Sequence, residues 1–282
     1  MLKRVKGNFE VLDPKLASQA TCDLEAQGFA MLPKVFSSAE INALRSAVEK
    51  TFIEFSLSHR SEKLSFDAED EFRHELFNKS SVLQDLLGKP ELLAVVEPLL
   101  GNDCHVIANT AWKNSPSDFA HGGQKWHIDA GPHIPLPGDC EWPNKIPFPV
   151  FVIATHIFLQ DCSIDDGPTG VIPHSHKSGR IPPRDRAYDD SLSFSGNHCV
   201  PLTATAGDVV FFVSDVWHRR MPTRQNSRGR FFIQIHYGRR DIAQRVKTTD
   251  EVNHVDVIAE ERAKTERQRT LIGLHSPYFY DG

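Results

Sequence analysis

Apolar positions divide the chain into an early part with helical spacing and a later part built from short apolar runs. In the early part, Ser37 and Glu40 have the spacing of a capping box, and apolar residues then recur at helical intervals. This pattern predicts a helix from about residue 38 to 55. Apolar residues at mixed three and four spacing predict two shorter helices within 81–100. The part of the chain over about 1–100 is therefore expected to be helical.

From about residue 103 the pattern changes to short runs rich in Val, Ile and Phe, separated by Gly and Pro, which is typical of strands. The runs are CHVIANTAW, FPVFVIATHIFLQ, GDVVFFVSDVW and RFFIQIHYG. They predict a β barrel or sandwich core over about 103–240. Two proline-rich loops, Gly131–Pro149 and Lys177–Pro201, lie between the runs. Long loops often carry function, so we predict that these two act as lids over a substrate.

The C-terminal stretch of about 255–270 is rich in charged residues and predicts an exposed helix without a chemical role. A chain of 282 residues can form one domain of this kind. We therefore expect a single domain over 1–282, mainly β with flanking helices.

Composition narrows the class of protein. The chain is 40% hydrophobic and 24% charged, as in ordinary globular proteins, and no apolar run approaches the length of about 20 residues that a membrane helix needs. The first residues lack the apolar core of a secretory signal, and the five cysteines form no C-x-x-C pair. The net charge of −5, without a long basic run, gives no footprint for nucleic acid. We expect a cytoplasmic protein that binds neither membrane nor nucleic acid, and assembly into a homo-oligomer stays open.

His127 and Asp129, in the segment KWHIDAG, form the first candidate metal-binding pair. Residues two apart on a strand point to the same face, so an imidazole and a carboxylate converge. A chain with 14 histidines contains such a pair by chance, and His254 with Asp256 is a second one. The second pair opens the charged C-terminal stretch and has no arginine after a further histidine, so we interpret it as the chance match.

His218, after the run GDVVFFVSDVW, supplies a third ligand. Two histidines and one carboxylate leave three coordination positions open, which suits iron(II) with oxygen and a bidentate cosubstrate. A lone histidine is by default a structural residue, and Arg230 is what changes this interpretation. Arg230 begins the run RFFIQIHYG, which is expected to return antiparallel beside the strand that carries His218. Its guanidinium can bind the distal carboxylate of 2-oxoglutarate in bidentate geometry, and Arg228 is the competing choice.

In this order and at these spacings, the motifs resemble the phytanoyl-CoA dioxygenase family, a branch of the iron- and 2-oxoglutarate-dependent oxygenases. The segments that carry the resemblance are GFAMLPKVFSSAEINALR, WHIDAG, HIFLQDCSIDDGPTGVIPHSHKSG, AGDVVFFVSDVWH and NSRGRFFIQIHYG. The resemblance implies a double-stranded β-helix core of the jelly-roll or cupin kind. It also implies iron(II) as the metal, with 2-oxoglutarate and O2 as cosubstrates.

The resemblance also bears on individual residues. It favours Arg230 over Arg228, and it adds Asn109 and His156 as secondary contacts to 2-oxoglutarate. The chain departs from the family where His174 and His176 follow Pro173, because the family has Pro-Gly-Ser-His there. These two histidines form a rival metal pair without a carboxylate, in a segment that reads as a turn.

The expected reaction is hydroxylation of a small-molecule metabolite or natural product, with release of succinate and CO2, and desaturation or ring chemistry stays open. Because related halogenases lack the carboxylate that Asp129 supplies here, halogenation is not expected. Arg219, Arg220 and Arg224, close to His218 in sequence, favour a substrate with a carboxylate.

Other features leave alternatives open. Trp142 and Phe148 in the first proline-rich loop would instead suit an apolar substrate. A cupin-type metal-dependent hydrolase or isomerase could use the same three ligands, although it would have no use for Arg230. A non-catalytic β-sandwich binding module is the third possibility, and it predicts that the three ligands are dispersed in space.

Overall fold

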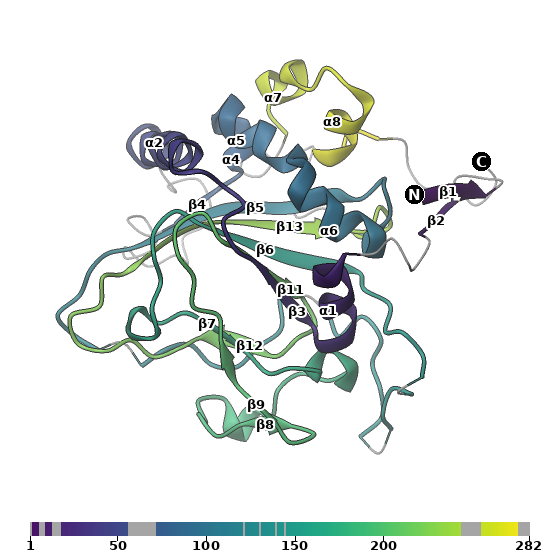
Figure 1. The fold of residues 1–282 in the computed structure, drawn as a ribbon, viewed down its shortest axis with the longest axis vertical. Helices are drawn as coiled ribbons and strands as arrows, with labels where there is room; N and C mark the ends of the chain where they lie inside the picture. Colours follow the sequence, from purple (N-terminus) through teal and green to yellow (C-terminus); the bar gives the residue numbers. More distant parts are fainter. Residues whose placement is uncertain are drawn as a thin grey trace.

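Two facing antiparallel sheets form the body of the protein, with helices packed against the outer side of the larger one (Figure 1). The computed structural model describes residues 18–55, 72–120, 122–129, 131–138, 140–143, 145–243 and 255–275, and the backbone of two strands before them. Those two strands, β1 (Leu2–Val5) and β2 (Phe9–Leu12), pair with each other. Among the described residues, no helix has the length and apolar character needed to cross a bilayer.

The larger sheet, called the major sheet, has six strands in the order β3-β11-β6-β13-β5-β4, and all of its neighbours are antiparallel. Its strands are β3 (Phe29–Leu32), β4 (Phe72–His74), β5 (His105–Asn114), β6 (Val152–Phe158), β11 (Val209–Val213) and β13 (Arg230–Gly238). The long strands β5 and β13 lie side by side and are the main scaffold for inward-facing side chains.

The smaller sheet, called the minor sheet, has the order β10-β7-β12. Its strands are β7 (Thr169–Val171), β10 (Val200–Pro201) and β12 (His218–Arg220), and a separate hairpin joins β8 (Ser193–Phe194) to β9 (Asn197–His198). An isolated antiparallel bridge between His127 and His218 extends this sheet past β12. The segment with the first candidate pair therefore belongs to the minor sheet.

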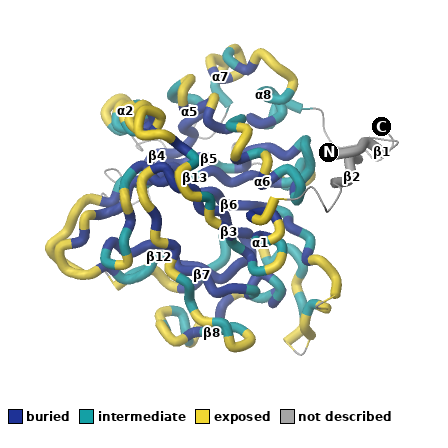
Figure 2. The backbone as a smooth tube through the Cα atoms, viewed as in Figure 1, coloured by how far each residue is buried: buried dark blue, intermediate teal, exposed yellow. Residues whose placement is uncertain are grey.

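Helices cover the outer face of the major sheet (Figure 1). They are α1 (Gln19–Gln27), α2 (Ser38–Glu54), α4 (Leu76–Lys79), α5 (Ser81–Asp85), α6 (Pro90–Leu100), α7 (Val257–Arg262) and α8 (Glu266–Leu271). Short 3₁₀ turns occupy Leu86–Gly88, Ile164–Asp166, Ser175–Ser178 and Arg184–Arg186. Figure 2 shows that the strands are largely buried, while exposed residues gather on the outer helices and the loops.

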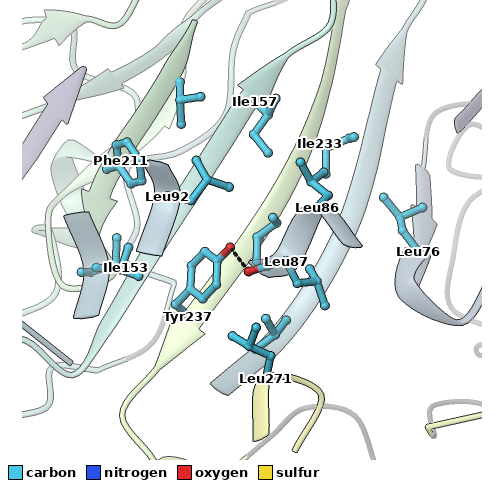
Figure 3. Packing of buried hydrophobic residues seen from close by; sticks show 14 of the residues in the cluster. Leu76, Leu86, Leu87, Leu92, Ile153, Ile157, Phe211, Ile233, Tyr237 and Leu271 are labelled. Atoms are coloured by element: carbon cyan, nitrogen blue, oxygen red, sulfur yellow. Dashed lines mark hydrogen bonds between the residues drawn. The ribbon is translucent and has the colours of Figure 1, made fainter. Parts of the chain in front are cut away.

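Alternation along the strands separates two cores. On β13, Phe231, Ile233, Ile235 and Tyr237 face the helices and join the main hydrophobic cluster, while Phe232 faces the other way, toward the minor sheet. Figure 3 shows the packing on the helical side, where the Tyr237 hydroxyl donates to the backbone carbonyl of Leu87 at 3.0 Å. The opposite face of β13 is therefore free to hold polar residues between the two sheets.

Gly28 ends α1 and leads directly into β3. Its φ of 90° lies in the left-handed region, which glycine adopts without a steric penalty. A Cβ added at this position would lie 2.6 Å from Nδ1 of His176. The turn therefore requires glycine for its conformation and for its close approach to the 3₁₀ turn at Ser175–Ser178.

The fold expected from the sequence is confirmed: the chain is mainly β with flanking helices, in a two-sheet core of the jelly-roll kind. The predicted helix over 38–55 is α2, and Ser37 and Glu40 form its capping box, with Glu40 Oε2 accepting from the Ser37 backbone N–H at 2.8 Å. The two shorter helices within 81–100 are α5 and α6.

Two expectations about the flanks need correction. The early part of the chain is not purely helical, because β3 and β4 form the two edges of the major sheet. The stretch over 255–270 forms two short helices, and its charged residues do more than face solvent. The Arg262 guanidinium donates to the Gln84 side chain and to the Phe77 carbonyl, so this part of the chain is tied to the helical layer.

Candidate metal centre

His127, Asp129 and His218 come together at one end of the space between the sheets. Each offers one ligand atom, and these three atoms lie within 4.8 Å of one another. The Oδ1 atom of Asp129 is 3.5 Å from Nε2 of His218 and 3.9 Å from Nε2 of His127. Among the described residues this is the one cluster of His, Cys, Asp and Glu able to hold a metal ion.

Backbone carbonyls fix the orientation of both imidazoles. Nδ1–H of His127 donates to the Lys125 carbonyl and Nδ1–H of His218 donates to the Val216 carbonyl, each at 2.9 Å. A carbonyl oxygen only accepts, so the proton of each neutral ring resides on Nδ1. In the neutral rings both Nε2 atoms therefore carry a lone pair and face Asp129, which is the arrangement of a metal-ligating histidine.

Charges within the cluster shift the protonation of its members. Burial, together with the neighbouring His218, lowers the pKa of His127. Burial opposes the charged form of Asp129, but His218 and His236 outweigh it and hold the pKa of this carboxyl well below its usual range. For His218, burial opposes protonation and Asp129 favours it more strongly, so the pKa of His218 is raised. A metal ion would replace that proton at Nε2.

A cavity of about 140 Å³ adjoins the cluster. It is bordered by the three clustered side chains, by inward-facing residues of the major sheet and by β12. This volume is below the roughly 300–1,000 Å³ of typical small-molecule sites. The enclosed space is therefore suited to a compact ligand, and a larger molecule must approach from its mouth.

Arg230 lies in the wall of this cavity, at the start of β13. The side chain is buried, its Nε donates to Oδ1 of Asn114 at 3.0 Å, and its guanidinium lies over the Phe232 ring. Arg228 is different, because its side chain is 56% exposed and its Nη2 donates to Asp166 at 2.9 Å. Of the two arginines considered, Arg230 is the one that faces the cavity.

The position of β13 corrects the topology expected for this arginine. Arg230 does not return beside the strand of His218, because β13 pairs with β5 and β6 in the major sheet. His218 is on β12, which pairs with β7 in the minor sheet. The connection between them crosses from one sheet to the other, as a double-stranded β-helix requires. His218 and Arg230 therefore face each other across the cavity.

Of the two predicted secondary contacts to 2-oxoglutarate, His156 lines the cavity and Asn109 does not. His156, on β6, lines the cavity; both of its ring nitrogens lack a hydrogen-bond partner among the described residues, and burial holds its pKa well below the usual range. Asn109 does not border the cavity: its Oδ1 accepts from the Phe77 backbone N–H at 3.0 Å, on the helical side of β5. The expectation for Asn109 is wrong because alternation along β5 turns it away from the site.

The sequence reasoning missed several polar residues at the site, among them Asn114, Gln234 and His236. Gln234 and His236 are two and three steps of alternation beyond Arg230 on β13, so they share its inward face. That alternation was readable from the run RFFIQIHYG and could have identified both. Asn114 is opposite Arg230 in the register of β5 and β13, which only the pairing reveals.

The predicted lids do not border the cavity. Within the described residues, neither Gly131–Pro149 nor Lys177–Pro201 contributes to its lining, and Gln124 lines it instead. Phe148 is buried against Trp142 and His176, so it does not cover a substrate. The loop Gly131–Pro149 is held away from the cavity by His133, whose Nδ1 is 2.5 Å from Oδ1 of the buried Asp215.

The three arginines expected near a substrate also separate. Arg219 and Arg220 border the cavity, whereas Arg224 pairs with Asp165 at the surface. The Arg219 guanidinium lies over the Trp126 ring and forms an ion pair with Asp190, so its charge is already engaged. Arg220 is two residues after His218 on the same strand and shares its face.

The rival metal pairs do not form such a cluster. The rings of His174 and His176 bind the backbone carbonyls of Ala26 and Glu25, at the end of α1. His254 lies outside the described residues, and Asp256 caps the N-terminus of α7.

Comparison with known proteins shows first the fold and then the family. The fold is shared with solved structures of 2-oxoglutarate-dependent enzymes. HygX from Streptomyces hygroscopicus, with nickel and 2-oxoglutarate bound, aligns with a TM-score of 0.58 and 18% identity over 83% of this chain and 90% of that chain. The epimerase SnoN of nogalamycin biosynthesis aligns with a TM-score of 0.58 and 16% identity over 80% and 84%. The carbocyclase SnoK aligns with a TM-score of 0.55 and 19% identity over 84% and 89%.

A sequence model of the Phytanoyl-CoA dioxygenase (PhyH) family matches residues 24–228. The chain belongs to this family, as the sequence motifs predicted. No match is found among the curated proteins. The family match ends two residues before Arg230, so the role of that arginine depends on its geometry.

Proposed function

We propose that this protein is an iron(II)- and 2-oxoglutarate-dependent oxygenase that acts on a small molecule. His127, Asp129 and His218 hold the iron, and Arg230 holds the cosubstrate. The observation that carries this proposal is the pair of oriented imidazoles. Their Nδ1–H groups are bound to backbone carbonyls, so both Nε2 atoms face one carboxylate oxygen beside a cavity that is lined by a buried arginine.

The donor set fits iron. Two imidazole nitrogens and one carboxylate oxygen with open positions form the facial arrangement of non-haem iron(II) oxygenases. An ion about 2.0–2.2 Å from each donor, with the donors at right angles, would have neighbouring donors about 2.8–3.1 Å apart. The separations of 3.5 and 3.9 Å from Asp129 Oδ1 to the two Nε2 atoms would therefore shorten by about 0.4 to 1.1 Å on metal binding, which small side-chain movements can supply.

The remaining walls fit a dianionic cosubstrate. Arg230 can bind a carboxylate through two N–H groups, and Asn114 holds its Nε side in place. His156 offers two ring nitrogens without other hydrogen-bond partners among the described residues. The cavity of about 140 Å³ suits a molecule the size of 2-oxoglutarate, and Phe212 and Phe232 give it part of an apolar wall. When bound, iron and 2-oxoglutarate supply the oxidising chemistry that cleaves a C–H bond, with succinate and CO2 as coproducts.

The substrate on this proposal is a metabolite or natural product that presents a C–H bond at the mouth of the cavity. Hydroxylation is the expected outcome, and the fold is compatible with others, since SnoN is an epimerase and SnoK a carbocyclase. HygX has been solved with hygromycin B bound, which supports a small-molecule substrate. Arg220, on the same face of β12 as His218, is best placed to meet a carboxylate of the substrate.

Anaerobic visible spectroscopy tests the proposal directly. The apo protein is titrated with iron(II) and then with 2-oxoglutarate, and a weak charge-transfer band is expected only when both are present. The band should be lost in Asp129→Ala and weakened in Arg230→Ala. Arg228→Lys is the control, because Arg228 faces away from the cavity. A folded, iron-loaded wild type without the band contradicts the proposal and favours a cupin-type hydrolase or isomerase, whose activity would persist under argon.

A further inference from the structure

We propose that His236 is a positioning residue that assigns the two oxygens of Asp129 to different tasks. One oxygen is kept for the metal, and the other is held away from it by a hydrogen bond. This inference rests on the proposed function, because it concerns how the iron ligand is oriented. His236 was not singled out as a site residue by the motifs, and it lies on β13 in the major sheet.

The two carboxylate oxygens have different neighbours. Oδ2 of Asp129 is 2.8 Å from Nε2 of His236. Oδ1 is the atom that faces Nε2 of His218 and Nε2 of His127. The His236 side chain is 5% exposed, so the contact is screened from water. A buried, short hydrogen bond to a carboxylate constrains both its rotation and its basicity.

The donor of this bond is Nε2 of His236. A carboxylate only accepts, so Nε2–H donates to Oδ2 of Asp129. Nδ1 of the same ring has no hydrogen-bond partner among the described residues, so the ring makes its short hydrogen bond through Nε2. The Gln234 side-chain nitrogen is 3.5 Å from Nε2 of His236, which is too long to compete with the bond to Asp129.

Gln234 in turn is held by the major sheet. Its side-chain oxygen accepts from the Trp112 indole N–H at 3.1 Å and from the Thr110 hydroxyl at 3.3 Å, both on β5. The side-chain nitrogen of Gln234 therefore faces His236. This leaves no acceptor on Gln234 that could draw the Nε2 proton of His236 away from Asp129.

The bond also connects the two layers of the fold. His236 projects from the major sheet, whereas Asp129 belongs to the segment that bridges to β12 of the minor sheet through His127. The backbone N–H of Asp129 donates to the Ser214 carbonyl at 3.1 Å, which fixes where its side chain begins. His236 then fixes where that side chain ends.

The consequence for metal binding is a carboxylate that binds through one oxygen. With Oδ2 engaged, Asp129 presents Oδ1 alone, and three coordination positions stay open for cosubstrate and oxygen. Without His236, Oδ2 loses the hydrogen bond that holds it away from the metal, and a turn of the carboxylate toward the metal would occupy a position that 2-oxoglutarate needs. Removing the His236 side chain should therefore weaken the binding of both the metal and the cosubstrate.

Three variants separate this role from general effects on the strand. His236→Leu removes the donor, and His236→Gln keeps an N–H at a similar distance from the backbone. Tyr237→Phe is the matched control, because it removes a hydrogen bond from the next residue of β13 on the opposite face. For each apo protein, the affinity for Mn(II) is measured by titration, followed by the affinity of the Mn(II)-loaded protein for 2-oxoglutarate. Thermal unfolding checks that each variant is folded.

We expect His236→Leu to lose about 10–100-fold in Mn(II) affinity, the usual effect of removing a partner that orients a ligand. Its 2-oxoglutarate affinity should fall as well, while His236→Gln and Tyr237→Phe remain within a few-fold of wild type. An unchanged His236→Leu, or a His236→Gln or Tyr237→Phe that loses as much as His236→Leu, contradicts the role of His236. A wild type that binds no Mn(II) contradicts the proposed function first, and the inference falls with it.

Discussion

His127 and His218 hydrogen-bond to each other through their backbones, each donating its N–H to the carbonyl of the other at 3.0 Å. The main chain therefore positions the two imidazoles, and a side-chain replacement leaves this bridge in place. The His127 side chain is one-third exposed. We therefore expect the His127→Ala variant to keep its fold and to lose its metal. Metal content and circular dichroism of the purified variant check this. A variant that unfolds would show that the imidazole itself supports the bridge.

Arg230 should be sensitive even to replacement by lysine. Lysine keeps the charge but lacks the planar pair of N–H groups that a bidentate carboxylate contact uses. Hydrogen bonds to charged groups contribute about 1.5–3 kcal/mol, so we expect the dissociation constant of 2-oxoglutarate to rise about 10- to 100-fold in Arg230→Lys. Anaerobic titration of the metal-loaded protein measures it. Arg228→Lys should leave the constant unchanged, and equal losses in the two variants would argue against Arg230 as the specific contact.

The chemistry of the site was more predictable than its topology. His127 and Asp129 could be predicted as a pair because their spacing and ligand types are local features, whereas His218, 89 residues after Asp129, was assigned from its place after a strand-like run and before Arg230. Arg230 was expected to bind the cosubstrate because it begins a strand-like run, and the family resemblance favoured it over Arg228. Which strand lies beside it was not predictable from local patterns, since pairing depends on how the chain crosses between sheets.

The errors have a common physical origin. Asn109 was placed at the site although alternation turns it to the helical side, where it accepts from Phe77. The loop over 131–149 was interpreted as a lid because it is long, but His133 is bound to the buried Asp215. In both cases the outcome depends on a partner distant in sequence. Sequence patterns report the period of an element, and they do not report which face meets which neighbour.

Tyr237→Phe should lower stability without affecting the metal. The Tyr237 hydroxyl is buried and donates to the Leu87 carbonyl at 3.0 Å, and its loss leaves that carbonyl without this donor. We expect the free energy of unfolding to fall by about 1–2 kcal/mol. Urea denaturation followed by circular dichroism measures it. A stability equal to that of wild type would mean that Leu87 finds another donor.

His105 should make the protein less stable in mild acid. Its Nε2–H donates to the Ile242 carbonyl and its Nδ1 faces His275 at 2.7 Å, with Asp103 and Arg240 nearby. Burial, and to a lesser extent His275, lowers the pKa of His105 to about 4 from the ordinary 6.5. The unfolded chain therefore takes up this proton first as the pH falls. The stabilising contribution is complete above pH 6.5 and is lost as the pH approaches 4.

The comparison variant for this pH dependence is His105→Gln, which can still donate to the Ile242 carbonyl but does not titrate. A pKa difference of this size corresponds to at most about 3 kcal/mol. We expect the free energy of unfolding to fall less steeply between pH 7 and pH 4.5 in the variant than in wild type. Parallel pH profiles for the two proteins would contradict the assignment.

His218 and Arg230 lie on opposite sheets, so on the proposed function the metal and the cosubstrate would connect the two sheets. A metal bound by residues of the minor sheet and a dicarboxylate bound by Arg230 on β13 would together form a non-covalent bridge between the two sheets. Binding of the metal and of 2-oxoglutarate should therefore slow amide hydrogen exchange in both β12 and β13, although these two strands do not pair with each other. The two sheets would then open least often when metal and cosubstrate are both bound, and most often after the cosubstrate has been consumed.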